Sequence, residues 1–286
     1  HLECVLSECD PDGWAAGGAW DNINLRFRNT EYYASYTAAI FGKLARLARD
    51  RDWDLKYLTW AFLFVGERCF EGTRAFSTQG IDKPILNLFR MLARLGDEEV
   101  SLVSTGSKDP LAYTDPYGRD AGPDISGLAA LAGNKILAIL LVNHHDDWDV
   151  AGEYPVSLAV ENLPFDSTDL VVRHYRIDAT HSNAHTVWMQ QGQPMYPTPG
   201  QYQAIRARDG LEMLRPAERI ASQDGRVTLA FTMPVHSVSL LTLTPQECSR
   251  RLLPVGSQCT FDDVAPLFYQ RRAGPGHYVA GPLVTI

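Results

Sequence analysis

The sequence has no long apolar run and no cluster of basic residues. Its longest apolar stretch, KILAILLVN at 135–143, has the length of a strand, whereas a membrane-spanning helix needs roughly 20 apolar residues. The formal charge is −8, and adjacent basic residues near the C-terminus occur only as pairs, at 250–251 and 271–272. We therefore expect a soluble protein, cytoplasmic or secreted, that binds neither nucleic acid nor membrane.

Cysteine is also scarce and is not arranged for metal binding. The five cysteines are Cys4, Cys9, Cys69, Cys248 and Cys259. They form no Cys-x-x-Cys motif and have no paired histidine signature, so we expect buried thiols rather than a zinc site. Cys248 and Cys259 flank a loop that a disulfide would close in an oxidising compartment, but the odd number leaves the compartment open. The chain starts at His1 with no leader, which predicts that it is cut from a longer one.

The first motif of interest is LSECDPDG, residues 6–13, where an acidic residue ends a short apolar run. Leu2 to Leu6 predict a buried strand, and the polar turn that follows ends it. Parallel α/β sheets place their functional groups at the C-terminal ends of strands, which makes Glu8 a candidate site residue. The alternative is an ordinary turn or capping acid, because acidic residues are common in turns.

Residues 1–96 read as strand, helix, strand, helix, the alternation of a parallel sheet. The spacing predicts a helix over 31–50 capped by Asn29 or Thr30, a buried strand over 55–66, and a helix over 80–96 closed by Gly96. Short strands without intervening helices follow over 97–244, which predicts an antiparallel β-sandwich. We expect them at 128–144, 154–163, 170–178, 226–233 and 236–244, with one helix at 199–209. Residues 245–286 form a Pro/Gly-rich C-terminal extension.

Four motifs together resemble glycoside hydrolase family 39, which contains β-xylosidases and α-L-iduronidases. They are LSECDPDGW, YLTWAF, GIDKPILNLFRMLARLG and RHYRIDATHSNAHTVWMQQGQPMYPTPGQY. The resemblance implies a (β/α)8 TIM barrel followed by a β-sandwich, so that 1–96 would be the last two β/α units of a truncated catalytic barrel. It also implies that Glu8 is the catalytic nucleophile. The family's acid/base residue belongs to an Asn-Glu pair, and this chain contains no such dipeptide.

Three further residues are candidate substrate contacts. Glu67 resembles a sugar-hydroxyl acceptor of the family's β-xylosidases, and Arg74 roughly matches an arginine that the α-L-iduronidases use on the substrate carboxylate. The alternative for both is an ion pair within the protein. Trp60 is a candidate apolar surface on which a pyranose ring could stack. The equally simple alternative is that Trp60 is an aromatic residue of the hydrophobic core.

We predict no catalytic role for two polar clusters. NHHDDWD at 143–149 has metal-ligand residue types, but adjacent strand residues such as His144 and His145 point to opposite faces. HYRIDATHSNAH at 174–185 is expected to dock the sandwich on the barrel through buried hydrogen bonds. We expect no metal and no cofactor.

The sequence thus predicts a fragment of a retaining exo-glycoside hydrolase, foremost a xylan 1,4-β-xylosidase acting on a xyloside by double displacement. Because the acid/base residue is absent, the chain alone is expected to be inactive. The alternatives are an α-L-iduronidase-type enzyme acting on a uronide, and a non-catalytic carbohydrate-binding protein built on the sandwich. An exposed row of aromatic side chains on one sheet face would favour the last alternative.

Overall fold

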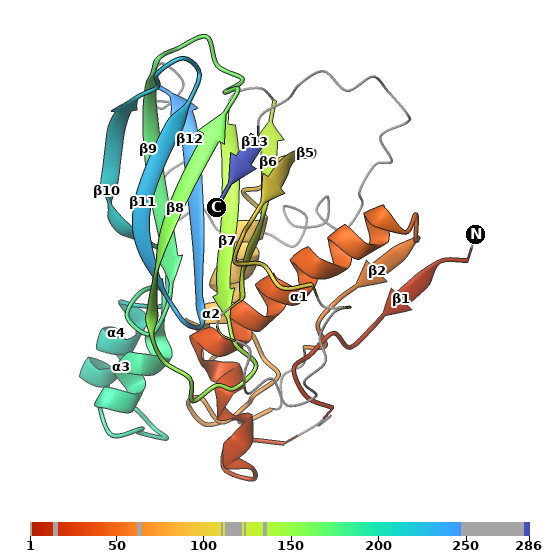
Figure 1. Ribbon diagram of the computed structural model, residues 1–286. Coiled ribbons are helices and arrows are strands. Elements are labelled where there is room, and N and C mark those ends of the chain that lie inside the picture. Colours follow the sequence, from red (N-terminus) through yellow and green to blue (C-terminus); the bar gives the residue numbers. More distant parts are fainter. Residues whose placement is uncertain are drawn as a thin grey trace.

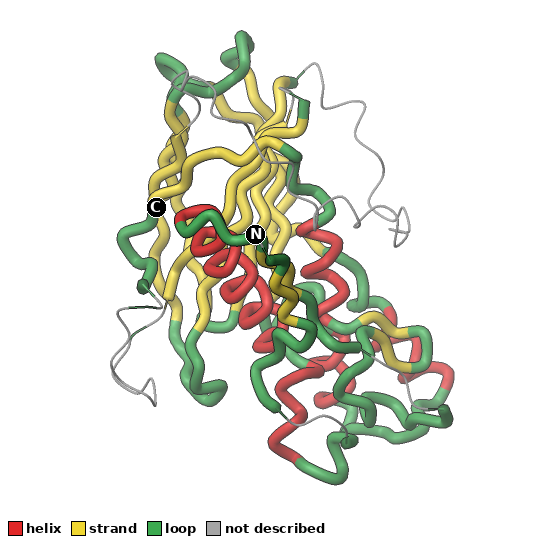
Figure 2. Tube along the Cα trace, turned by 90° about the vertical axis from the view of Figure 1, so that its right-hand side faces the viewer, coloured by secondary structure: helices red, strands yellow, loops and turns green. Residues whose placement is uncertain are grey.

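The computed structural model describes residues 2–13, 17–61, 65–109, 111, 122, 124–133, 136–246 and 283–286. Helices α1 and α2 and a pair of short strands lie beside one face of a large sheet, with α3 and α4 at one end of it (Figure 1). The view turned by 90° shows the long strands in the upper part and most helices and loops in the lower part (Figure 2). Within the described ranges, no helix is both long enough and apolar enough to span a membrane.

The N-terminal strands are shorter and more exposed than the sequence predicts. β1 (Cys4–Leu6) and β2 (Leu55–Tyr57) pair in parallel, with Cys4 opposite Leu55 and Leu6 opposite Tyr57. The prediction of one buried strand over 55–66 is wrong, because ladder pairing stops at Tyr57 and residues 58–61 and 65–66 belong to no strand. Residues 62–64 lie outside the described residues. All of β1 is exposed. In the described part of the chain β1 and β2 have only each other as strand neighbours, so no further strand pairs with their outer edges.

Helix α1 confirms the prediction over 31–50. It spans Glu31–Asp50 and follows a 3₁₀ turn, η1 (Ile23–Asn29). The side chain of Thr30 accepts a hydrogen bond from the backbone N–H of Tyr32, which satisfies one of the free amides of the first turn. Glu31 at the start and Arg49 near the end complement the helix dipole.

Helix α2 is shorter than predicted, spanning Pro84–Leu92 rather than 80–96. Residues before it instead form a small hairpin of β3 (Ser77–Thr78) and β4 (Ile81–Asp82). Gly96 does not cap the helix. A Cβ atom at Gly96 would lie 1.8 Å from the carbonyl oxygen of Leu131, so this glycine permits close approach to the sheet.

Among the described residues, the large sheet has nine strands in the order β10-β9-β12-β7-β6-β5-β13-β8-β11. Their bounds are β5 Glu98–Val103, β6 Asp124–Ala132, β7 Ile136–His144, β8 Glu153–Glu161, β9 Asp169–Ile177, β10 Glu212–Ala221, β11 Val227–Pro234, β12 Ser237–Pro245 and β13 Leu283–Thr285. Neighbouring strands are antiparallel except β13 and β5, which are parallel. The strands predicted at β8, β9, β11 and β12 are confirmed. The single strand predicted over 128–144 is wrong, because two antiparallel strands, β6 and β7, occupy that range. Strands β5, β10 and β13 were not predicted.

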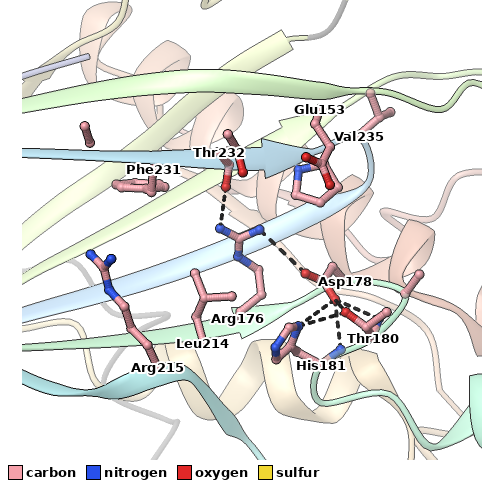
Figure 3. A pocket seen from close by; sticks show the side chains of 13 residues that line it. Glu153, Arg176, Asp178, Thr180, His181, Leu214, Arg215, Phe231, Thr232 and Val235 are labelled. Carbon is pink, nitrogen blue, oxygen red and sulfur yellow. Dashed lines mark hydrogen bonds and ion pairs between the residues drawn. The ribbon is translucent and has the colours of Figure 1, made fainter.

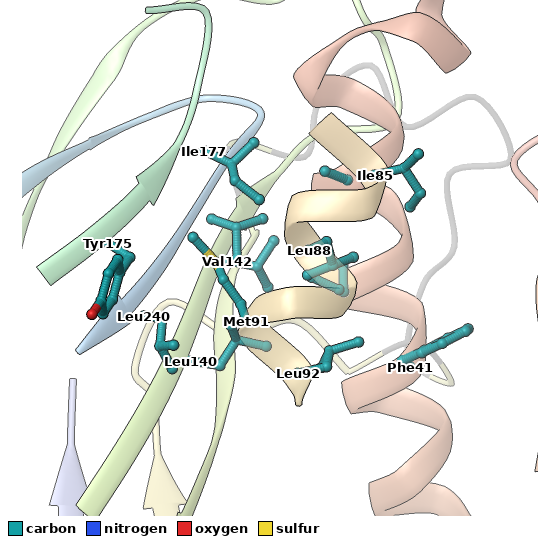
Figure 4. Packing of buried hydrophobic residues seen from close by; sticks show 14 of the residues in the cluster. Phe41, Ile85, Leu88, Met91, Leu92, Leu140, Val142, Tyr175, Ile177 and Leu240 are labelled. Atoms are coloured by element: carbon teal, nitrogen blue, oxygen red, sulfur yellow. The ribbon is translucent and has the colours of Figure 1, made fainter. Parts of the chain in front are cut away.

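Strand β7 contributes to two hydrophobic cores because its side chains alternate between the two faces of the sheet. Ala138, Leu140 and Val142 pack with α1 and α2. Leu137, Ile139 and Leu141 pack with β8 and β11 on the other side. Figure 4 shows the first core, where Leu88, Met91 and Leu92 of α2 lie between α1 and the sheet. This core joins residues on both sides of the predicted domain boundary at 96/97.

Hydrogen bonds join the segment 174–185 to both α1 and α2. That this segment docks a sandwich on a barrel stays a prediction. The Asn183 side-chain amide donates to the carboxylate of Glu31 at the start of α1, at 2.8 Å. The Asn87 amide of α2 donates to the backbone carbonyl of Ser182 at 3.1 Å. The segment leads into α3 (Ala184–Gln190), which was not predicted, and α4 (Pro199–Arg206), which confirms the helix expected at 199–209.

The predicted C-terminal extension of 245–286 is described only at its two ends. Residues 283–285 form β13, which completes the contact between β5 and β8. Residues 247–282, including Cys248 and Cys259, lie outside the described residues.

Candidate active site

Glu8 follows the C-terminal end of β1 by two residues, as predicted. The backbone continues beside the segment after β2, since the Leu58 amide donates to the Leu6 carbonyl at 3.0 Å and the Cys9 amide donates to the Leu58 carbonyl at 2.8 Å. The Glu8 side chain is exposed. It therefore points away from the packed interior at the same end of the strand pair as Trp60.

Asp10, two residues further on, is the centre of a buried cluster of charges. Its Oδ2 accepts a hydrogen bond from Nη1 of Arg74, and its Oδ1 accepts one from the Tyr33 hydroxyl at 2.6 Å. Nη1 of Arg28 lies 3.5 Å from Oδ1, while Nη2 of Arg28 pairs with Asp12 at 2.8 Å. The side chains of Asp10, Arg28 and Arg74 are at most 2% exposed.

This cluster joins four separate segments: the turn after β1, the turn η1, helix α1 and the loop after β2. Burial and the Asp10 carboxylate both raise the pKa of Tyr33, which keeps its hydroxyl protonated as a donor to Asp10. Sequence reasoning missed Asp10 and Arg28. The available signal was the position of Asp10 in the same strand-end turn as Glu8, which we interpreted only as a turn.

Trp60 lies over Arg74 rather than in the core. The Arg74 guanidinium carbon is 5.3 Å from the centre of the Trp60 ring, and 36% of Trp60 is exposed. The Trp60 amide also points to Oδ2 of Asp10 at 3.4 Å. The structure therefore brings Trp60 and Arg74 together beside the turn that carries Glu8.

Glu67 is partly buried and packs against Gly72. A Cβ atom at Gly72 would lie 2.1 Å from Oε2 of Glu67, so the carboxylate occupies the space that a side chain at 72 would need. The carbonyl of Gly72 accepts a hydrogen bond from Nζ of Lys83, which is fully buried, at 2.5 Å. Sequence reasoning missed Lys83, which lies within the helix predicted over 80–96 and was given no role of its own.

The sequence model of the glycosyl hydrolases family 39 matches residues 27–228, which is more than half of the chain. The chain belongs to glycosyl hydrolase family 39. The matched range includes Trp60, Glu67 and Arg74 and begins after Glu8.

Relatives of this family 39 chain include iduronidases and a xylosidase. Mouse α-L-iduronidase is 26% identical in an alignment of 147 positions that covers 45% of this chain and 22% of the mouse protein. A bacterial orthologue of human α-L-iduronidase has a similar structure, with a TM-score of 0.64 and 22% identity over 86% of this chain. A monomeric β-xylosidase from Caulobacter crescentus CB15 gives a TM-score of 0.57 and 16% identity over 86% of this chain. The chain spans 42% and 46% of those two structures.

A separate hollow of about 590 Å³ lies between β9, β10 and β11 of the family 39 chain. Arg176, Asp178, His181 and Arg215 line it, and none of the four predicted site residues does (Figure 3). Its buried charges are occupied within the protein. Arg176 donates to the Thr232 carbonyl at 2.8 Å, and Asp178 accepts from the His181 amide at 2.8 Å. We therefore place the candidate active site at the ends of β1 and β2 and not in this hollow.

The histidines of NHHDDWD face different partners. His144 Nδ1 lies 3.0 Å from the Ser35 hydroxyl of α1, whereas His145 Nδ1 accepts the Asp147 amide at 3.0 Å. In the described part of the chain, no group of three or more His, Cys, Asp or Glu residues has a metal-binding arrangement.

Proposed function

We propose that the chain is the C-terminal part of a retaining exo-glycoside hydrolase, with 1–96 forming the last two units of a (β/α)8 barrel and 97–244 a β-sandwich domain. The observation that carries the proposal is the parallel pair β1–β2, joined by α1, with Glu8 exposed just beyond the end of β1. Leu2, Val5 and Leu6 are 90%, 50% and 44% exposed. Apolar strands of this kind need neighbours on both sides, which further barrel strands would supply.

In this proposal Glu8 is the nucleophile. Its carboxylate attacks the anomeric carbon and forms a glycosyl–enzyme ester while the aglycone leaves with a proton from a carboxylic acid that this chain lacks. Water activated by the same second residue then cleaves the ester and returns Glu8 to its ionised form. The Asp10 cluster fixes the backbone two residues from Glu8, because Asp10 is held by Arg28, Arg74 and Tyr33.

The remaining candidates, Trp60, Glu67 and Arg74, would contact the sugar. The exposed part of Trp60 offers an apolar face on which a pyranose ring can stack. Glu67 would accept a hydrogen bond from a sugar hydroxyl. Arg74 would separate a neutral xyloside from a uronide, because a guanidinium binds a carboxylate. Its side chain is 2% exposed and pairs with Asp10, so a uronide carboxylate would have to replace part of that pairing.

Between these two sugars, we favour the uronide over the xyloside that the sequence placed first. The support is the 26% identity to mouse α-L-iduronidase and the position of Arg74 beside Trp60. The β-xyloside stays as the second candidate, because Asp10 and Asp12 balance the charges of Arg74 and Arg28 and leave no excess positive charge in the cluster.

A non-catalytic carbohydrate-binding role finds less support. The exposed aromatic side chains of the described residues are Trp53, Trp60, Trp148 and Tyr196. None of them belongs to a strand of the large sheet as far as the structure describes it, so the sheet presents no row of aromatics there.

The test is covalent labelling of the complete enzyme with a mechanism-based 2-deoxy-2-fluoro glycoside. We expect the label on Glu8, and Glu8→Gln should abolish turnover even of substrates with activated leaving groups, because the first chemical step needs the nucleophile. Inactivation with the label on another residue would exclude Glu8. The 286-residue chain alone should show negligible turnover. Robust hydrolysis by it would contradict the proposal that the acid/base residue lies outside this chain.

The sugar is tested by comparing kcat/KM for an aryl α-L-iduronide and an aryl β-xyloside. We expect the iduronide to be preferred, and Arg74→Gln to reduce kcat/KM for the iduronide more than for the xyloside. A complete enzyme that turns over only the xyloside would assign the second candidate.

A further inference from the structure

The loop from Glu67 to Arg74 is held in a strained conformation. Phe70 is fully buried with φ +54, a left-handed conformation that costs free energy for a residue with a side chain. Two hydrogen bonds fix it there, from the Asn29 side chain to the Phe70 carbonyl at 3.0 Å and from the Phe70 amide to the Thr78 hydroxyl at 2.8 Å. A strained backbone that neighbouring groups over-determine is typical of functional sites.

Gly72 lies against both the carboxylate of Glu67 and the ammonium of Lys83. The Glu67 carboxylate occupies the side-chain position of Gly72, and the Lys83 ammonium donates to the Gly72 carbonyl. Any larger residue at 72 would displace Glu67. Because position 72 is a glycine, both Glu67 and Lys83, the residue just before α2, can approach it.

Lys83 has no contact with solvent, yet it does not lie in an apolar environment. Burial lowers the pKa of Lys83 to about 7, against the opposing effect of the Glu67 charge. His185 also faces it, and burial, followed by the charge of Lys83, lowers the pKa of His185 to about 3, so the imidazole is neutral. Burial raises the pKa of Cys69 to about 11, so its thiol is neutral as well. Glu67 is thus the charged partner of the Lys83 ammonium among these three neighbours.

We propose that Lys83 is a positioning residue of the substrate site, whose buried ammonium holds the Glu67 carboxylate over Gly72 and so fixes the loop that carries Glu67 and Arg74. The catalytic part of this inference rests on the proposed glycosidase function. The positioning itself does not, because it concerns groups within this chain. Deprotonation of Lys83 near neutral pH removes the charge that faces Glu67, so the arrangement of Glu67 should depend on pH in that range.

The first experiment follows the ¹³C resonance of the Glu67 side-chain carboxyl in the 286-residue chain between pH 5 and pH 9. We expect an inflection near pH 7, at the pKa of Lys83, which Lys83→Met removes. Lys56→Met is the matched control, since Lys56 forms an exposed ion pair with Glu3. Glu67→Gln should move the titration of the Lys83 ¹³Cε resonance to lower pH, which tests the coupling without altering Lys83. Superimposable Glu67 curves for the wild type and Lys83→Met, or an unmoved Lys83 titration in Glu67→Gln, would overturn the proposal.

The second experiment measures pH profiles of the complete enzyme. If Glu67 contacts the sugar, Lys83→Met should raise KM about tenfold with a smaller change in kcat, because the lost orientation weakens binding of substrate and transition state alike. Lys83→Arg should restore part of the loss. If the Glu67 and Lys83 resonances are coupled but the complete enzyme hydrolyses no glycoside, the positioning role is retained and the proposed function is rejected. An active enzyme with unchanged KM in Lys83→Met would reject the role in the substrate site.

Discussion

Glu8 and Asp10 stand two residues apart in one turn, but the protein places their carboxylates in opposite environments. Glu8 is exposed, whereas Asp10 is buried between Arg28 and Arg74 and accepts a hydrogen bond from Tyr33. A buried carboxylate of this kind is retained only with charged partners, because desolvation of an unpaired charge is costly. Exposure therefore suits Glu8 to contact a ligand, and burial suits Asp10 to hold the turn.

Asp10→Asn should destabilise the chain by about 3 kcal/mol, because it leaves two buried guanidinium groups with one carboxylate fewer. Urea unfolding monitored by circular dichroism measures the change. Asp50→Asn is the control, since Asp50 pairs with Arg49 where both side chains are at least half exposed, and it should change stability by less than about 0.5 kcal/mol. A similar loss in both variants would contradict the structural role of Asp10.

Lys83 gives the chain a pH dependence whose sign follows from its burial. The folded protein holds Lys83 with a pKa of about 7, below the ordinary value of 10.5 that applies to the unfolded chain. Between these values the unfolded state binds the additional proton, so stability rises with pH across this window. Below pH 7 both states are protonated and the penalty is constant.

Relative to Lys83→Met, the wild-type chain should therefore gain on the order of 3 kcal/mol of stability between pH 7 and pH 10. Unfolding in urea at a series of pH values measures this difference. Subtracting the variant removes the contribution of other groups that titrate in the same range. A constant difference between the two proteins would show that Lys83 titrates alike in the folded and unfolded states.

At the level of elements, local signals predicted what local interactions determine. The Thr30 cap, the apolar stripe and the basic end of α1 are all encoded within 21 consecutive residues, and its bounds were predicted correctly. The continuous apolar run of β7 and the apolar residues of β12 likewise marked buried strands. Strand β10 was missed, because its sequence EMLRPAERIA is polar and carries a proline. Within the described ranges it is an edge strand that pairs with β9 alone.

Long-range packing explains the remaining differences. The strand after Asp54 stops at Tyr57 although its sequence stays apolar, because ladder partners rather than composition set strand length. For the candidate site, the strand-end turn identified Glu8, but no local pattern showed that Arg28, Arg74 and Tyr33 converge on Asp10. Gly96 was predicted as a helix cap, whereas its role depends on Leu131 in a different element.

Gly96→Ala tests that role. We expect a loss of about 1–3 kcal/mol, because the new methyl group would overlap the backbone of β6 and force the end of α2 away from the sheet. Gly13→Ala is the control, since a Cβ atom at Gly13 would meet no atom within 4 Å. Thermal unfolding of both variants measures the effect. If Gly96 served as a helix cap in the left-handed conformation, a Gly96→Asn variant would retain stability, which the overlap with Leu131 does not allow.

For the whole molecule, the shared core matters more than the predicted boundary at 96/97. Helices α1 and α2 pack with Leu140, Val142 and Leu240 of the sheet, and hydrogen bonds from Asn183 and Asn87 join the two parts. The strands β1 and β2 share none of this packing except through Tyr57, which lies at the edge of the core. The main structural division therefore lies between the hydrophobic core, which both predicted domains share, and the exposed strand pair β1–β2.

Hydrogen exchange of the 286-residue chain should reflect this division. We expect the amides of β7 and β12 to be the most protected, those of α1 and α2 to follow them, and those of β1 and β2 to exchange fastest, because exposed hydrogen bonds open with little free-energy cost. In the complete enzyme, the proposed barrel strands would cover Val5 and Leu6, so the amides of β1 and β2 should become protected while those of β7 change little. Fast exchange throughout residues 1–96 would instead mean that α1 and α2 unfold with their strands. Equal protection of β1 and β7 in the 286-residue chain would contradict the exposure on which the proposed barrel rests.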